Sequence, residues 1–94
     1  GGIGVISVLS NLMPRETSDI CKKYLAGDTA GALKLQLDLL PLVNNLFTEV
    51  NPIPVKAAMS AMGYGENSLR LPLTPMDEAK EAVLLGIMKG HGLI

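Results

Sequence analysis

The chain has 94 residues, of which 48% are hydrophobic, and its formal net charge is −1. This length excludes more than one domain but allows a small hydrophobic core. The near-zero charge, with no basic cluster larger than Lys22-Lys23, gives no electrostatic basis for binding nucleic acid or an anionic membrane. A lone cysteine, Cys21, excludes an internal disulfide and any multi-cysteine metal site. Together with apolar runs too short to span a bilayer, this composition predicts a cytoplasmic protein.

Residues 1–9 are predicted to form a β-strand that has no partner elsewhere in the sequence. Apolar residues at Val5, Ile6, Val8 and Leu9 occupy both faces of the pleat, which is typical of a strand buried in a parallel sheet or barrel. An isolated strand leaves its backbone polar groups unpaired. We therefore expect the chain to be the end of a larger protein, cut before its last strand. We also expect this strand to pair with a second copy of the chain or to be displaced from its barrel geometry.

The next two segments are predicted to be helical. Residues 14–26 carry a narrow apolar stripe and end at Gly27, a natural residue for a helix C-terminus. Asp28 is a good N-cap for a second helix that runs to about residue 48. The start of that helix also alternates with the period of a strand, but its residues are strong helix formers, so we predict a helix with leucines buried on more than one side. The alternating residues are Leu33, Leu35, Leu37 and Leu39.

Two further helices complete the prediction. Residues 54–62 have apolar side chains at helical spacing and stop at Gly63, and residues 75–89 follow Thr74, the expected N-cap. Between them we expect a loop that is held on the core by Leu69, Leu71 and Leu73. The predicted fold class is therefore mainly α, with one N-terminal strand and about four helices. Strand, loop and first helix together form one βα unit, like a repeat of an α/β barrel.

The N-terminal segment holds the first candidates for chemistry. Gly1, Gly2 and Gly4 would suit a phosphate loop, but they precede the strand, whereas ligands of α/β folds bind at the carboxyl ends of strands. A tight turn leading into the strand is the favoured interpretation. Ile6 and Ser7 lie nearer the functional end and can line an active site, although packing inside a barrel is the more frequent role.

The remaining candidates favour structural roles. His91 follows a helix C-terminus, where a positive charge interacts well with the helix dipole. Cys21 falls on an apolar stripe and is expected to be a small buried hydrophobe. Lys56 has no neighbouring acid–base partner, so a surface lysine is favoured over a Schiff-base lysine. We predict no catalytic residue, no metal ligand and no cofactor site.

Three stretches are similar to the C-terminal third of the bacterial dihydrodipicolinate synthase family. They are residues 1–8 (GGIGVISV) with Asn11 and Pro14, residues 46–56 (LFTEVNPIPVK) and residues 69–75 (LRLPLTP). The last two stretches favour this family over the related N-acetylneuraminate lyases, which remain an alternative.

The resemblance implies the C-terminal part of a (β/α)8 TIM barrel. Residues 1–27 would supply its last βα unit, with strand eight and helix eight, and residues 28–94 would be a helical extension. Enzymes of the family condense pyruvate with aspartate semialdehyde in lysine and diaminopimelate biosynthesis, usually as homotetramers, through a Schiff base on a barrel lysine. That lysine, the tyrosine proton relay and the carboxylate-binding arginine would all lie upstream of residue 1.

One position carries over from the family. Ile6 matches the strand-eight isoleucine whose backbone faces the catalytic lysine, so it is expected to lie near the substrate. The chain itself is predicted to be catalytically silent and to close the barrel of its parent, with the rest of that barrel as its partner. The alternative hypothesis is a free-standing helical module that dimerises through residues 1–9 and the leucine-rich second helix.

Overall fold

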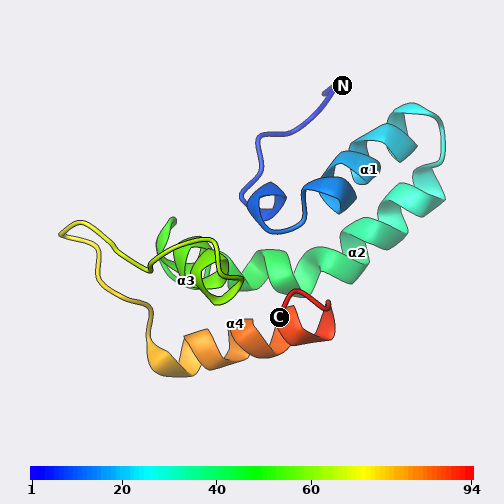
Figure 1. Cartoon of the computed structure of the whole chain (residues 1–94). Coiled ribbons are helices and arrows are strands. Elements are labelled where there is room, and N and C mark those ends of the chain that lie inside the picture. Colours follow the sequence, from blue (N-terminus) through cyan, green and yellow to red (C-terminus); the bar gives the residue numbers. More distant parts are fainter.

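A computed structural model describes all residues 1–94. The chain forms four α-helices and one short 3-10 helix, and it contains no β-strand. Figure 1 shows α1 (Pro14–Leu25) and α2 (Thr29–Asn45) as an antiparallel hairpin. The helix α3 (Ile53–Ala61) follows at the end of α2, and α4 (Glu78–Gly90) runs back along α2 and α3. The predicted class, mainly α with four helices, is confirmed.

The predicted N-terminal strand is not formed. Residues 1–6 make no backbone hydrogen bond, and the chain leads away from the helices (Figure 1). Leu9, which was predicted to end the strand, instead begins the 3-10 helix η1 (Leu9–Asn11) and is buried. The physical reason is that a strand is completed by its neighbours, and no second strand is present.

The ends of α1 and α2 agree with the local sequence. At the end of α1, Gly27 has a φ of +90° and Asp28 N–H donates to the Lys23 carbonyl at 2.8 Å. This is the Schellman arrangement, which requires a left-handed residue and favours glycine. The Asp28 carboxylate then accepts a hydrogen bond from Gly31 N–H at 2.9 Å, which caps α2 as predicted. Helix α2 ends at Asn45, three residues before the predicted end.

The start of α4 differs from the prediction. The N-cap is Asp77 rather than Thr74, because the Asp77 carboxylate accepts from Lys80 N–H at 3.1 Å. The backbone N–H of Asp77 donates in turn to the Glu49 carboxylate at 2.8 Å. Glu49 lies in the connection after α2, so a contact across 28 residues of sequence sets where α4 begins.

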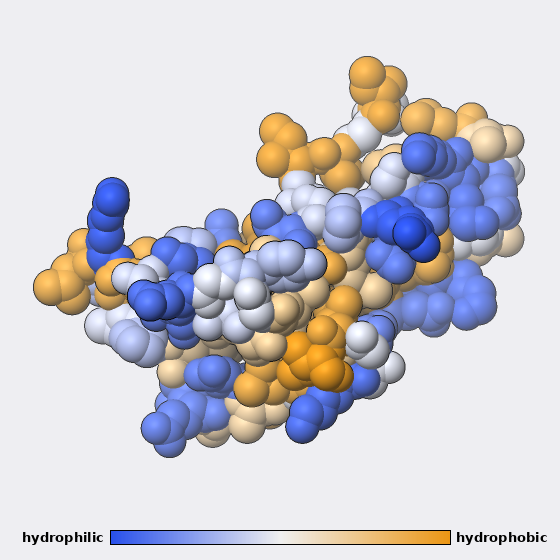
Figure 2. Space-filling view, viewed as in Figure 1, coloured by the Kyte–Doolittle hydropathy of each residue, from blue (hydrophilic) through white to orange (hydrophobic).

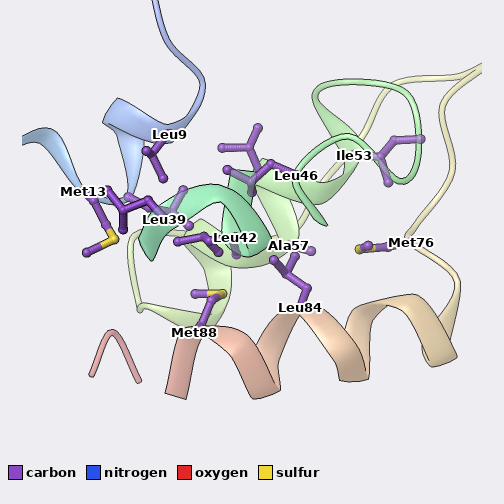
Figure 3. Packing of buried hydrophobic residues seen from close by; sticks show 13 residues of the cluster. Leu9, Met13, Leu39, Leu42, Leu46, Ile53, Ala57, Met76, Leu84 and Met88 are labelled. Atoms are coloured by element: carbon purple, nitrogen blue, oxygen red, sulfur yellow. The ribbon is translucent and has the colours of Figure 1, made fainter. Parts of the chain in front are cut away.

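A single hydrophobic core joins all the helices. Leu42 from α2 and the C-cap residue Leu46 that follows it meet Leu84 and Met88 from α4, and all four side chains are fully buried (Figure 3). Leu9, from η1, packs on the same cluster, so the N-terminal part and the helical remainder share one core. The other members are Leu12, Met13, Leu39, Ile53, Val55, Ala57, Ala58 and Met76.

The long connection between α3 and α4 is only partly anchored. Leu69 and Leu73 pack against the core, as predicted, but Leu71 is 85% exposed. Figure 1 shows this connection projecting from the end of the molecule. None of the four helices has the length and the apolar character that a membrane span requires.

Candidate functional site

The junction between the N-terminal segment and α1 is held by short-range hydrogen bonds. Ser7 Oγ accepts from Ser10 N–H at 3.2 Å, and Ser10 Oγ donates to the Ser7 carbonyl at 2.6 Å. Asn11 Nδ2 donates to the Val8 carbonyl at 3.0 Å. The Ser7 hydroxyl therefore stabilises the turn into η1. No histidine stands beside it as a base, because the only histidine lies after α4.

Residues 1–6 form an unpaired edge in front of that junction. Their backbone N–H and C=O groups have no partner in the chain. The side chain of Ile6 is completely exposed, and Val5 is 66% exposed. Figure 2 shows apolar side chains on this projecting part of the molecule. Unpaired backbone groups and exposed β-branched side chains are what a buried strand shows when its neighbouring strands and covering helices are absent.

Two adjoining apolar hollows lie between this segment and the helical hairpin. The larger has a volume of about 490 Å³ and is walled by Tyr24 and Leu25 at the end of α1 and by Leu33 of α2. The smaller reaches Val43 and Phe47 at the other end of α2. Both are lined by Ile20, Cys21 and Gln36.

The chemistry of this lining is apolar. No Lys, Arg, Asp, Glu or His borders either hollow. Small-molecule sites combine an apolar wall with a few convergent polar groups that orient the ligand. The polar side chains of the lining, among them Thr17, Thr29 and Gln36, carry no charge, and most of the lining is apolar, so the hollows suit apolar side chains of a neighbouring element.

The other candidate site residues lie in separate parts of the molecule and form no common site. His91 is the C-cap residue of α4, as expected for a dipole contact. Cys21 is half-buried on the wall of the hollows rather than in the core, because the apolar stripe of α1 faces these hollows. The predicted turn at Gly1 to Gly4 stays a prediction: the chain bends at Ile3, and no backbone hydrogen bond closes a turn there. Nowhere do three His, Cys, Asp or Glu side chains gather in a group able to hold a metal ion.

Sequence reasoning missed part of the exposed surface of α2. The leucines of this helix were expected to be buried on more than one side, yet Leu33 and Leu37 are more than half exposed while Leu39 is buried. The sequence did indicate that leucines lie on several sides of this helix, but it did not indicate which of them would be covered. Within this chain α2 packs against α1 and α4, and the side that carries Leu33 and Leu37 finds no partner.

Comparison with known proteins matches nearly the whole chain to a single family. The dihydrodipicolinate synthetase family matches residues 1–90. The chain is 56% identical to the 4-hydroxy-tetrahydrodipicolinate synthase of Lachnoclostridium phytofermentans and 54% identical to that of Clostridium tetani, over all 94 residues in each case. It spans 32% of each of these relatives, or about a third of their length.

The structure agrees with that of a solved relative. The dihydrodipicolinate synthase of Thermotoga maritima, a TIM-barrel enzyme, superposes on 100% of this chain with a TM-score of 0.97 at 45% identity, using 32% of its own chain. A superposition this close over every residue includes the N-terminal segment. The expectation that this segment is displaced from its barrel geometry is therefore wrong: it keeps its course although nothing in this chain pairs with it. From the matched residues and the shared backbone alike, the chain belongs to the dihydrodipicolinate synthetase family.

Proposed function

We propose that the chain is a structural part of a 4-hydroxy-tetrahydrodipicolinate synthase and is catalytically silent by itself. Residues 4–9 would be the last strand of the barrel, α1 its last helix, and residues 28–94 a helical extension. The observation that carries this proposal is the unpaired edge of residues 1–6, which is apolar on both faces yet belongs to a chain with no other strand. A neighbouring strand on each side would satisfy its backbone groups.

The whole enzyme would be a pyruvate-dependent lyase of lysine and diaminopimelate biosynthesis. It would hold pyruvate as a Schiff base and condense it with aspartate semialdehyde in the cytoplasm. The identity of 56% to a named synthase supports this assignment. Within it, Ile6 would lie near the substrate, with its backbone facing the catalytic lysine. The complete exposure of Ile6 on an unpaired segment fits a residue that faces the missing part of a barrel.

The positions of the lysines support the proposal that the chain by itself is catalytically silent. A Schiff-base lysine must lose its proton near neutral pH, which requires burial or a neighbouring cation. No lysine borders the hollows beside the N-terminal segment. The partners proposed for the chain are the rest of the barrel and, through it, further subunits of a homo-oligomer.

The test compares the chain alone with a full-length chimera. In the chimera, residues 1–94 replace the matched third of the Lachnoclostridium phytofermentans synthase. Both proteins are incubated with pyruvate and borohydride and examined by mass spectrometry, with the unmodified synthase as a positive control. We expect a pyruvate adduct and condensation activity in the chimera and no adduct on the chain alone. An adduct on the chain alone would disprove its silence, and an inactive chimera would disprove the structural role.

A further inference from the structure

Residues 7–11, which we call the exit turn, connect the unpaired N-terminal segment to the helices, and side chains bond two of their carbonyls. The Ser7 carbonyl accepts a hydrogen bond from Ser10 Oγ at 2.6 Å. The Val8 carbonyl accepts two from Asn11, one from its backbone N–H at 3.1 Å and one from Nδ2 at 3.0 Å. Ser7 Oγ accepts from Ser10 N–H at 3.2 Å. These bonds together fix the backbone of the exit turn.

The exit turn is anchored on the hydrophobic core. Leu9, within the turn, is buried, and so are Leu12 and Met13, which follow it. The Leu9 carbonyl accepts from the backbone N–H groups of both Leu12 and Met13, at 3.0 and 2.9 Å. The turn is therefore tied to the core through buried side chains and backbone hydrogen bonds, whereas residues 1–6 make no backbone hydrogen bond.

The exit turn sets the direction in which residues 1–6 leave the core. No neighbouring strand holds these residues in this chain. The whole chain nevertheless superposes on the Thermotoga maritima synthase with a TM-score of 0.97. The hydrogen bonds that lie nearest to the segment are those of the exit turn. We therefore attribute the course of the segment to the geometry of this turn.

The place of the exit turn in a barrel gives this geometry a consequence for catalysis. Active sites of TIM-barrel enzymes lie at the carboxyl ends of the strands. If residues 4–9 are the last strand, as proposed above, the exit turn lies at that end and directly follows Ile6. The backbone at Ile6 has no hydrogen bond of its own in this chain, so its position depends on the residues that follow it.

We propose that Ser7 and Asn11 are positioning residues of the synthase, an inference that rests on the proposed function. Their side chains hold the backbone of the exit turn, and the turn holds Ile6 in its place beside the catalytic lysine. Neither side chain has to touch the substrate for this role. Placement of this kind matters because a displacement of about 1 Å at a reacting group can cost about 100-fold in rate.

The test uses the full-length chimera with Ser7→Ala or Asn11→Ala, each of which removes one side-chain bond of the exit turn. Asn45→Ala is the matched control for Asn11→Ala. Asn45 Nδ2 also donates to a backbone carbonyl at the surface, that of Pro41 at 2.9 Å, but it lies at the end of α2, outside the exit turn. For each variant we measure kcat, the KM for pyruvate, the rate at which borohydride traps the pyruvate adduct, and the Tm.

We expect both exit-turn variants to lower the rate of the chemical step. In Ser7→Ala and Asn11→Ala, kcat and the trapping rate at saturating pyruvate fall at least about fivefold while KM changes less than about twofold, because the turn places reacting groups without binding pyruvate. In Asn45→Ala the kcat, the KM and the trapping rate stay as in the unmodified chimera. The Tm of Asn45→Ala falls about as much as that of Asn11→Ala, since each loses one bond of the same kind.

A purely structural role of the exit turn gives a different pattern. The Tm and the amount of folded enzyme would fall in Ser7→Ala and Asn11→Ala, while the kcat of the folded enzyme stayed unchanged. That result overturns the positioning role and leaves the proposed function standing, as does an equal loss of kcat in Asn45→Ala. A raised KM with unchanged kcat overturns it as well, because it indicates a contact with the substrate. An unmodified chimera that folds but is inactive overturns the proposed function, and this inference with it.

Discussion

Leu42→Ala is the substitution that tests most directly whether the helices form one cooperative core. Leu42 is fully buried in the last turn of α2 and belongs to the cluster that joins η1, α3 and α4. Truncating it removes three carbon atoms and leaves a cavity that the neighbouring helices fill only in part. Substitutions of this kind cost about 2–5 kcal/mol.

That cost is large for a chain of this size. At about 0.05–0.15 kcal/mol per residue, 94 residues have a total free energy of unfolding of roughly 5–14 kcal/mol. Leu42→Ala therefore removes at least about a seventh of the stability, and about a third at the middle of both ranges. The corresponding fall in Tm is at least about 8 °C, since 1 kcal/mol corresponds to about 4–8 °C in domains of 60–100 residues. Urea and thermal unfolding of the chain, followed by circular dichroism at 222 nm, measure both quantities.

Leu37→Ala provides the matched control on the same helix. Its side chain is 55% exposed on the outward side of α2, so the substitution costs less than about 1 kcal/mol in the chain alone. The reasoning is refuted if the two substitutions cost the same, or if Leu42→Ala costs less than about 1 kcal/mol. Either result would mean that α2 and α4 do not share the packed core described here.

Substitutions at three further positions test local features, each by urea unfolding of the chain. Glu49→Ala should cost about 1–2 kcal/mol, because it leaves the N–H of Asp77 without its carboxylate acceptor. Glu49→Gln keeps an acceptor oxygen and should cost less. Equal losses of stability in the two variants would contradict the hydrogen bond. Gly27→Ala should destabilise by about 1 kcal/mol, since φ is +90° at this residue, and an unchanged midpoint would argue against the Schellman turn. Gly86→Ala, inside α4 with open space around the added methyl, should stabilise by about 0.5–1 kcal/mol, and a loss of stability would show that the site is closed.

The four helices could be predicted from the sequence because their signals are local. Gly27 ends α1 and Asp28 caps α2 through hydrogen bonds that span only a few residues. Apolar spacing likewise predicted the positions of α3 and α4 to within a few residues. The motifs in residues 46–56 and 69–75 also pointed to the correct family.

What only the tertiary structure decided depends on groups far apart in sequence. The start of α4 is set at Asp77 by Glu49, a partner 28 residues away, rather than by the local Thr74-Pro75 pattern. Which leucines of α2 are buried depends on where α1 and α4 pack against it, so Leu42 is enclosed and Leu37 is left exposed. The N-terminal strand is the clearest case. Its apolar residues were evident from the sequence, but a strand exists only when a neighbour pairs with its backbone, and this chain contains no such neighbour.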